Sequence, residues 1–257
     1  MRASLGERAR RARDAFRSDR RWTGDPTPRA PREVGHERFW PFLADRLNDP
    51  SVRVFEIGSR EVSSASLWKT YFPRADYTGF DVMEGANVDV VGDAHSLSDH
   101  FEPGSFDWVI STAVFEHLAM PWIAAEEIAK VLKVGGQVLV ETHFCFSEHE
   151  LPWHFFHYHF EGLKVLFCEP LGFEVLDSGF TNPIVGRFSD DAAPYLRGAN
   201  VGDLYCHVDV LARKTRDVLE PGSPPFDWRA ALPAVTANTS YPSGTGLSAA
   251  SADSSDD

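Results

Sequence analysis

The sequence lacks several features that would assign it to a class at once. No second or third glycine follows Gly58, so the G-x-G-x-x-G loop that cradles a dinucleotide pyrophosphate is absent, and no Tyr-x-x-x-Lys pair occurs. The three cysteines form no C-x-x-C pair, and their odd number argues against a disulfide framework. No apolar run approaches the roughly 20 residues that cross a bilayer. These absences disfavour a nicotinamide-dependent dehydrogenase, a disulfide scaffold and a membrane protein.

Positive charge is also scarce. The chain has 25 Lys and Arg against 38 Asp and Glu, which gives a formal net charge of -13. Because binding to phosphates requires clustered basic residues, we expect no nucleic-acid partner. The N-terminus has no apolar core of a secretory signal, and the cysteine count fits a reducing compartment. We therefore expect a cytoplasmic protein without a membrane segment.

With 257 residues, the chain has room for one α/β domain and two tails. Residues 1–33 form an arginine-rich arm and linker, for which a solvated helix and a contact with an anionic partner both stay open. Residues 34–214 form the domain. Residues 215–257 are rich in Pro, Ser and Asp and have little to bury, so we expect a largely disordered tail.

Within the domain, helical and strand patterns alternate. We expect helices over residues 36–47, 63–71, 122–132 and 160–171, and strands over residues 52–57, 77–82, 88–91, 106–111, 137–142, 173–178 and 204–212. Ser63 and Ser64 offer cap oxygens to the second helix, and Gly135-Gly136 are expected to end the third. This alternation predicts an α/β fold with a doubly wound, mostly parallel seven-stranded sheet.

Acidic side chains stand at the ends of the first three predicted strands. Glu56 and Gly58 end the first strand, Asp81 ends the second and lies 23 positions after Gly58, and Asp93 follows the third. Ligands of open parallel sheets bind outside the carboxyl ends of the strands, where a carboxylate accepts from ribose hydroxyls. Three acids at one edge favour a ligand that brings donors and a positive charge. The alternative for each Asp is a turn or a helix cap.

Six short segments in this order resemble the class I S-adenosylmethionine (SAM)-dependent methyltransferases that act on small molecules. They are FEIG at 55–58, GFD at 79–81, GDAH at 92–95, FDWVIS at 106–111, EHL at 116–118 and VLKVGGQV at 131–138. The resemblance covers residues 52–180. It implies a Rossmann-like fold in a single domain, SAM as the cofactor, and an enzyme that methylates an oxygen or nitrogen of a small organic acceptor. A catalytically inactive SAM-fold binding or scaffold protein is the alternative.

The resemblance also assigns roles. Glu56 is expected near the SAM amino group, Asp81 on the ribose hydroxyls, and Val82 or Met83 on the adenine face. Asp93 and the Ala94 amide are expected at the adenine edge. The predicted cofactor site is completed by Gly58, Ser59 and Ser111. Where the family carries further glycines this chain has Ser59-Arg60, so hydroxyls of Ser59, Ser63 or Ser64 are expected to replace backbone contacts.

Glu116-His117, just after the fourth predicted strand, is the candidate catalytic pair, because an acceptor hydroxyl or amine must lose a proton. The alternative is that Glu116 caps a turn and His117 packs. Half of the ten histidines lie in the aromatic segment 143–159, which follows the fifth strand. From it we predict an acceptor pocket of His143, His149, Trp153 and His157. The segment offers metal-ligand types, but none of its spacings is an established ligand pattern, so we predict no metal.

Overall fold

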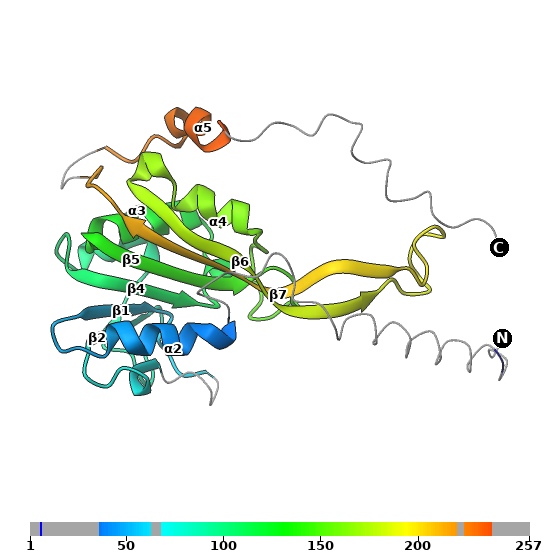
Figure 1. The fold of residues 1–257 in the computed structure, drawn as a ribbon, viewed down its shortest axis with the longest axis horizontal. Helices are drawn as coiled ribbons and strands as arrows, with labels where there is room; N and C mark the ends of the chain where they lie inside the picture. The colour runs from blue at the N-terminus through cyan, green and yellow to red at the C-terminus, as the bar shows by residue number, and fades with distance from the viewer. Residues whose placement is uncertain (1–5, 7–35, 63–67, 220–223, 238–257) are drawn as a thin grey trace.

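The structure is a computed structural model that describes residues 6, 36–62, 68–219 and 224–237 (Figure 1). Three predictions lie wholly or mostly outside these residues. They are the arm at 1–33, the first part of the helix at 63–71 with its Ser63 and Ser64 caps, and the tail beyond residue 237.

Seven strands form one sheet in the order β3-β2-β1-β4-β5-β7-β6. Their bounds are Arg53–Ile57 (β1), Asp76–Asp81 (β2), Val90–Val91 (β3), Phe106–Thr112 (β4), Leu132–His143 (β5), Phe173–Arg187 (β6) and Asn200–Lys214 (β7). Strands β1 to β5 pair in parallel, and β7 runs antiparallel between β5 and β6. The predicted mostly parallel, Rossmann-like seven-stranded sheet is confirmed.

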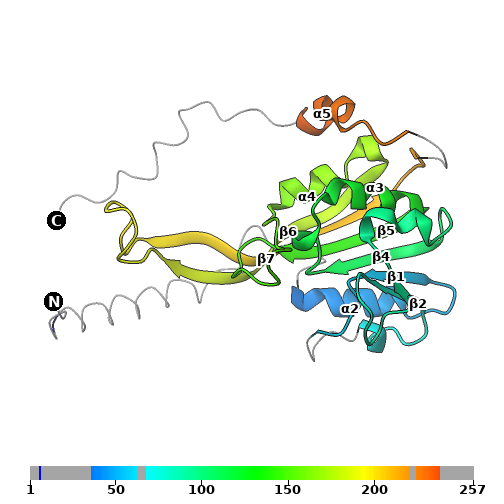
Figure 2. The same cartoon turned by 180° about the vertical axis from the view of Figure 1, so that it is seen from behind.

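Helices cover both faces of this sheet (Figures 1 and 2). The α-helices span His36–Leu47 (α2), Pro121–Val131 (α3), Phe160–Leu166 (α4) and Trp228–Thr236 (α5), and 3-10 turns span Trp68–Thr70 (η1), Ala94–Asp99 (η2), Phe115–His117 (η3) and Glu169–Leu171 (η4). On β1, Val54 packs with Leu47 of α2, whereas Phe55 packs with the cluster that includes Ile128 of α3. Because both faces of the sheet are covered, the strand sequences are short apolar runs and do not alternate between apolar and polar residues.

Two boundary predictions need correction. Gly135-Gly136 do not end α3: the helix ends at Val131, β5 begins at Leu132, and both glycines lie inside that strand. The predicted helix at 160–171 stops at Leu166, because the chain turns into η4, where Pro170 lacks the amide hydrogen that a continued helix needs.

The last two strands are longer than the sequence predicts. Strands β6 and β7 extend beyond the rest of the sheet as a paired hairpin, drawn in yellow-green and yellow in Figure 1. The predicted segment at 204–212 includes most of the part of β7 that pairs with β5, and the predicted segment at 173–178 lies in the part of β6 that pairs with the end of β7. Gly179, Pro183 and Gly186 weaken the strand signal of the outer part, where pairing with β7 keeps β6 extended.

The expectation of a largely disordered tail over 215–257 does not hold for residues 224–237. Asp227 caps α5 by accepting from the Arg229 and Ala230 amides. Phe226 and Trp228 pack against the same core cluster as α3, and the Trp228 indole donates to Glu126 Oε1 over 2.7 Å. The buried Glu126 carboxylate therefore gains a partner from this segment, which ties it to the domain.

Candidate active site

The carboxyl ends of β1 and β4 meet where the strand order reverses. From β1 the chain proceeds outward to β2 and β3, whereas β4 lies on the other side of β1 and is followed by β5. Such a reversal opens a crevice above the carboxyl ends of the two central strands. The predicted site residues follow these strands.

Gly58 turns the chain away from β1 at a place that excludes any side chain. Its φ is +83°, in the left-handed region, and a Cβ there would lie 2.1 Å from Val114 Cγ2. The amides of Gly58 and Ser59 both donate to the Phe80 carbonyl, over 2.8 and 3.1 Å. One glycine therefore suffices to bring this loop against both β2 and the segment after β4.

The loop after Gly58 is held in place by the side chain of Ser59. Ser59 is buried, and its hydroxyl donates to the Asn87 carbonyl over 2.9 Å. A Cβ on Gly79 would lie 1.9 Å from that same carbonyl oxygen. The Ser59 hydroxyl thus fastens the segment after β2 to this loop.

Asp81 is fixed at the end of β2 by the surrounding backbone. Its Oδ1 accepts from the Met83 amide over 2.9 Å, and its Oδ2 accepts from the Arg60 amide over 3.3 Å. The side chains of Val82 and Met83 next to it are 70% and 56% exposed. A carboxylate oriented beside exposed apolar side chains suits a nucleoside, with hydroxyls on the acid and a base on the apolar surface.

Glu56 lies almost fully buried on β1, where the Tyr77 hydroxyl donates to its Oε2. Burial raises the pKa of Glu56 to about 8; the Tyr77 hydrogen bond opposes this rise and the charge of Asp81 adds to it. The carboxyl is therefore protonated at neutral pH until a cation approaches. An amino group of the ligand would favour its charged form.

Asp93 and Ser111 are two further predicted cofactor residues, one at the start of η2 and the other inside the sheet. Asp93 caps η2 by accepting from the His95 amide over 2.9 Å, and the His95 Nδ1 lies 2.6 Å from the same oxygen. Burial opposes the shift, but these hydrogen bonds hold the pKa of Asp93 below its usual value. Ala94, the next residue, is buried. Ser111 is fully buried within the sheet, and its hydroxyl has no hydrogen-bond partner among the residues that the structure describes.

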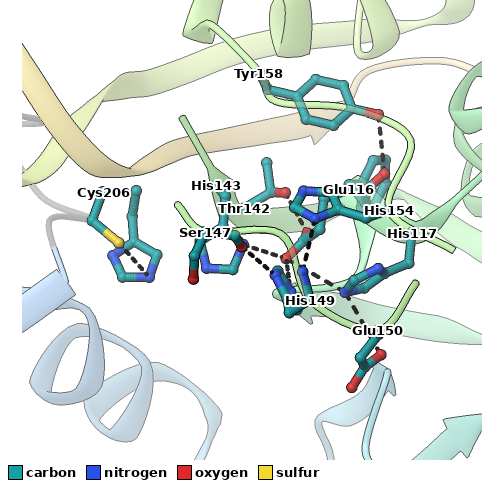
Figure 3. A network of polar contacts seen from close by, with 12 residues as sticks. Glu116, His117, Thr142, His143, Ser147, His149, Glu150, His154, Tyr158 and Cys206 are labelled. Carbon is teal, nitrogen blue, oxygen red and sulfur yellow. Dashed lines mark hydrogen bonds and ion pairs between the residues drawn. The ribbon is translucent and has the colours of Figure 1, made fainter. Parts of the chain in front are cut away.

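Glu116 is the centre of a second group, beyond the ends of β4 and β5 (Figure 3). Its side chain is fully buried. Thr142 donates to Oε2 over 2.5 Å, and the His143 Nδ1 lies 2.7 Å from Oε1. Burial opposes ionisation, yet the adjacent His143 and the hydrogen bond from Thr142 outweigh it and lower the pKa of Glu116. Glu116 is thus a carboxylate held inside the protein.

Further histidines converge on the same oxygen. His117 Nε2 lies 3.9 Å and His149 Nε2 lies 4.0 Å from Glu116 Oε1. His154 stands beside His149, with ring centroids 4.6 Å apart, and His157 stands 4.9 Å from His154. The structure therefore brings together the predicted catalytic pair and three of the four predicted pocket residues.

The segment after β5 folds back to build this group. The Phe155 amide donates to the Glu116 carbonyl over 2.8 Å, and the Tyr158 hydroxyl donates to the Phe115 carbonyl over 3.1 Å. Trp153, the fourth predicted pocket residue, contributes its carbonyl, which lies 2.7 Å from His117 Nδ1, while its side chain is 63% exposed. Thr142 and Tyr158 were missed by the sequence analysis, although Thr142 directly precedes His143 at the end of a predicted strand.

Residues 55–140 match a protein-family model described as a methyltransferase domain. The match runs from β1 to β5 and includes Gly58, Asp81, Asp93 and Glu116. With the doubly wound seven-stranded sheet and the acids at the strand ends, it identifies a class I SAM-dependent methyltransferase domain. The chain accordingly carries the domain of a methyltransferase enzyme, with SAM as the cofactor. The oriented Asp81, the apolar surface beside it and the buried Glu56 fit that cofactor.

Several solved structures are similar to the chain. The YcgJ protein from Bacillus subtilis has 16% identity and a TM-score of 0.47, with 69% of this chain and 97% of that chain covered. The 1,6-didemethyltoxoflavin-N1-methyltransferase from Burkholderia thailandensis, solved with S-adenosylhomocysteine, has 15% identity, a TM-score of 0.49 and coverage of 84% and 92%. The CurJ carbon methyltransferase has 14% identity, a TM-score of 0.44 and coverage of 70% and 53%. No curated protein sequence matches the chain.

Among the described residues, each helix is too short or too polar to serve as a membrane span.

Proposed function

We propose that the protein moves the methyl group of SAM to an oxygen or nitrogen of a small organic acceptor. The observation that carries this proposal is the buried Glu116 with its histidines, which lies beyond the ends of β4 and β5, next to the crevice at β1 and β4. Such a group suits an acceptor that must lose a proton. A carbon acceptor of ordinary acidity would need a stronger base than imidazole.

In the proposed complex, SAM lies along the ends of β1 and β2. Asp81 accepts from the ribose hydroxyls, Val82 and Met83 cover the adenine, and Glu56 receives the amino group. Asp93 and the Ala94 amide stand at the adenine edge, and the backbone at Gly58 and Ser59 follows the methionine part. The fixed orientation of Asp81 and the exposure of its apolar neighbours support this placement.

The chemical step is an in-line displacement. The acceptor lone pair forms a bond to the methyl carbon, the bond from carbon to the sulfonium breaks, and S-adenosylhomocysteine leaves. Positioning supplies most of the rate advantage because the methyl group is already activated. The proton of the acceptor goes to a base.

We assign the base role to His117 and a positioning role to Glu116. The Trp153 carbonyl fixes the hydrogen of His117 on Nδ1, so Nε2 offers its lone pair. The imidazolium that forms there is stabilised by Glu116 Oε1 at 3.9 Å and Glu150 Oε2 at 3.8 Å. Glu116 itself is fully buried and already accepts from Thr142, so it orients the histidines rather than touching the acceptor.

Two broader expectations stay part of this proposal. The net charge of -13 supports a small acceptor over a nucleic acid. The cysteines at 145, 168 and 206 are free, which supports the cytoplasmic location expected from the sequence.

The test has two stages. Calorimetry with SAM shows whether the cofactor binds, and labelled SAM with a cell extract reveals the acceptor without a guess. We expect transfer of the label and release of S-adenosylhomocysteine, a loss of at least about tenfold in rate for His117→Ala from its role as base, and an unchanged rate for the exposed His100→Ala. SAM binding without any transfer would instead favour the inactive SAM-fold protein, and no SAM binding would overturn the proposal.

A further inference from the structure

We propose that Glu116, His143 and His149 form a binding site for one divalent transition-metal ion, with Zn²⁺ as the first ion to test. The three residues each offer one ligand atom, and these atoms all lie within 4.8 Å of one another. They come from three different segments, η3, β5 and the loop after β5. The site goes beyond the proposed methyl transfer, which requires no metal.

The hydrogen positions on two histidines leave a place for a cation. His149 Nδ1 lies 3.0 Å from the Ser147 carbonyl oxygen, which can only accept, so this nitrogen carries the hydrogen. The neutral ring then turns the lone pair of Nε2 toward Glu116 Oε1, 4.0 Å away. His117 is oriented in the same way: its Nδ1 lies 2.7 Å from the Trp153 carbonyl oxygen, and its Nε2 lies 3.9 Å from Glu116 Oε1. Acceptor atoms that face a buried carboxylate repel it unless a cation lies between them.

The distances suit an ion after small side-chain rotations. Ligand atoms about 2.1 Å from a tetrahedral Zn²⁺ lie about 3.4 Å from one another. From Glu116 Oε1, His143 Nδ1 is at 2.7 Å and His149 Nε2 is at 4.0 Å, so the observed separations lie on either side of that value. The other oxygen, Oε2, already accepts from Thr142. This outer hydrogen bond orients the carboxylate and leaves Oε1 for the ion.

The imidazole rings around Glu116 stand close to one another. The ring centroid of His149 lies 4.8 Å from that of His117, 5.2 Å from that of His143 and 4.6 Å from that of His154. Protonating several of these rings would place like charges side by side. One metal ion neutralises the carboxylate while its imidazole ligands stay uncharged.

A neighbouring group, formed by His143, Cys206 and His207, is less suited. Asn182 Nδ2 lies 2.8 Å from His207 Nδ1, so the amide donates to that nitrogen and the ring hydrogen sits on Nε2. This is the nitrogen that faces Cys206 Sγ, at 3.7 Å. A ring nitrogen that carries the hydrogen cannot bind a metal, whereas His143 Nδ1 and Glu116 Oε1 are buried without a hydrogen-bond partner among the described residues, so we place the ion at the Glu116 group.

The ligand types decide the class of ion. Two imidazoles and one carboxylate favour Zn²⁺, Co²⁺ or Fe²⁺ over Mg²⁺ and Ca²⁺, which prefer oxygen ligands. Three protein ligands leave a coordination position for water or for an acceptor oxygen. The binding of an acceptor oxygen to the ion rests on the proposed function. An ion in this position would hold the acceptor hydroxyl and lower its pKa.

The experiment uses the full chain, produced without a histidine tag and stripped with a chelator. Zn²⁺ is titrated in a calorimeter, and Co²⁺ is followed by its visible absorption. We expect one ion per chain with a Kd at or below about 1 μM, and at least about a tenfold loss for His149→Ala and for His143→Ala, in line with the cost of losing a ligand or its support. The exposed His100→Ala is the matched control and should bind as the parent does.

The outcomes separate this inference from the methyltransferase proposal. SAM binding is measured on every variant in the presence of chelator, which also shows that each variant is folded. If SAM binds but no ion does, or if His149→Ala binds Zn²⁺ as tightly as the parent, the metal site is wrong and the methyltransferase proposal stands. If the ion binds as expected but no acceptor is ever methylated, the metal site stands and the proposed function fails.

Discussion

Arg60 Nε lies 3.4 Å from Asp81 Oδ1, and the Arg60 amide also donates to Asp81 Oδ2. Arg60 occupies the second position after Gly58, where the G-x-G-x-x-G pattern has glycine. Its side chain also covers Gly85, where a Cβ would lie 2.6 Å from Arg60 Cγ. The loop without further glycines therefore holds the Asp81 carboxylate through its own backbone and side chain.

Asp81→Ala should lower the affinity for SAM much more than Arg60→Ala does. Hydrogen bonds to a charged group contribute about 1.5 to 3 kcal/mol each, so loss of the carboxylate should weaken binding by at least about tenfold. The ion pair to Arg60 is partly exposed and contributes about 1 kcal/mol or less, which limits its loss to about fivefold. Calorimetric titration with SAM checks both values. Equal losses in the two variants would contradict a direct contact of Asp81 with the cofactor.

Gly58→Ala should destabilise the protein more than Gly135→Ala, although both glycines have a positive φ. At Gly135 no atom of the described residues would lie within 4 Å of an added Cβ, so only the backbone strain of about 1 to 2 kcal/mol applies. At Gly58 the clash with Val114 adds about 1 to 3 kcal/mol. Urea unfolding measures the difference. Val114→Ala in the Gly58→Ala background should recover part of the extra loss, and no recovery would show that the clash is relieved in another way.

The central sheet could be predicted because β1 and β4 are largely buried on both faces and the first three strands each end near a glycine or an acid. Gly58, Asp81 and Asp93 stand next to such runs, so their place at one edge of the sheet follows from parallel strand order alone. The outer half of β6 carries no such pattern, since Pro183 and Gly186 weaken the strand signal and only pairing with β7 defines it.

The contacts within the site depend on tertiary structure that no local pattern encodes. The bond of the Ser59 hydroxyl to the Asn87 carbonyl is an example, since the two residues lie 28 positions apart in the chain. Glu116 and His143 were both singled out, yet their contact required η3 and the end of β5 to meet. Helix α5 was not predicted, because prolines surround it and no local pattern shows that the Trp228 indole donates to the buried Glu126.

The free energy of unfolding should depend on pH through Glu56. Its pKa is raised from 4.5 to about 8 in the folded protein, so between these values the folded state holds a proton that the unfolded chain has released. Stability therefore falls as the pH rises through this window, by at most about 1.4 kcal/mol per pH unit for one group.

Glu56→Gln isolates this effect, because the amide does not titrate. Relative to the parent protein, the variant should gain stability as the pH goes from 5 to 8, as measured by urea unfolding without SAM. Asp209, whose pKa burial and the neighbouring Glu141 also raise, acts in both proteins and cancels in the difference. A difference that is constant with pH, or that falls, would contradict a protonated Glu56.

Trp228→Phe should destabilise the domain although the tryptophan lies in the expected tail. The substitution keeps an aromatic ring on the core but removes the indole hydrogen that Glu126 Oε1 accepts. The Glu126 carboxylate is buried, so an unmet acceptor there costs about 1 to 3 kcal/mol, which corresponds to a loss of about 2 to 12 °C in Tm for a domain of this size.

Trp122→Phe is the matched control, since Trp122 lies partly exposed on α3, the helix that also carries Glu126. In a Glu126→Leu background the Trp228→Phe substitution should cost much less, because no buried acceptor is left without its donor. An equal cost in both backgrounds would mean that α5 is held by ring packing alone.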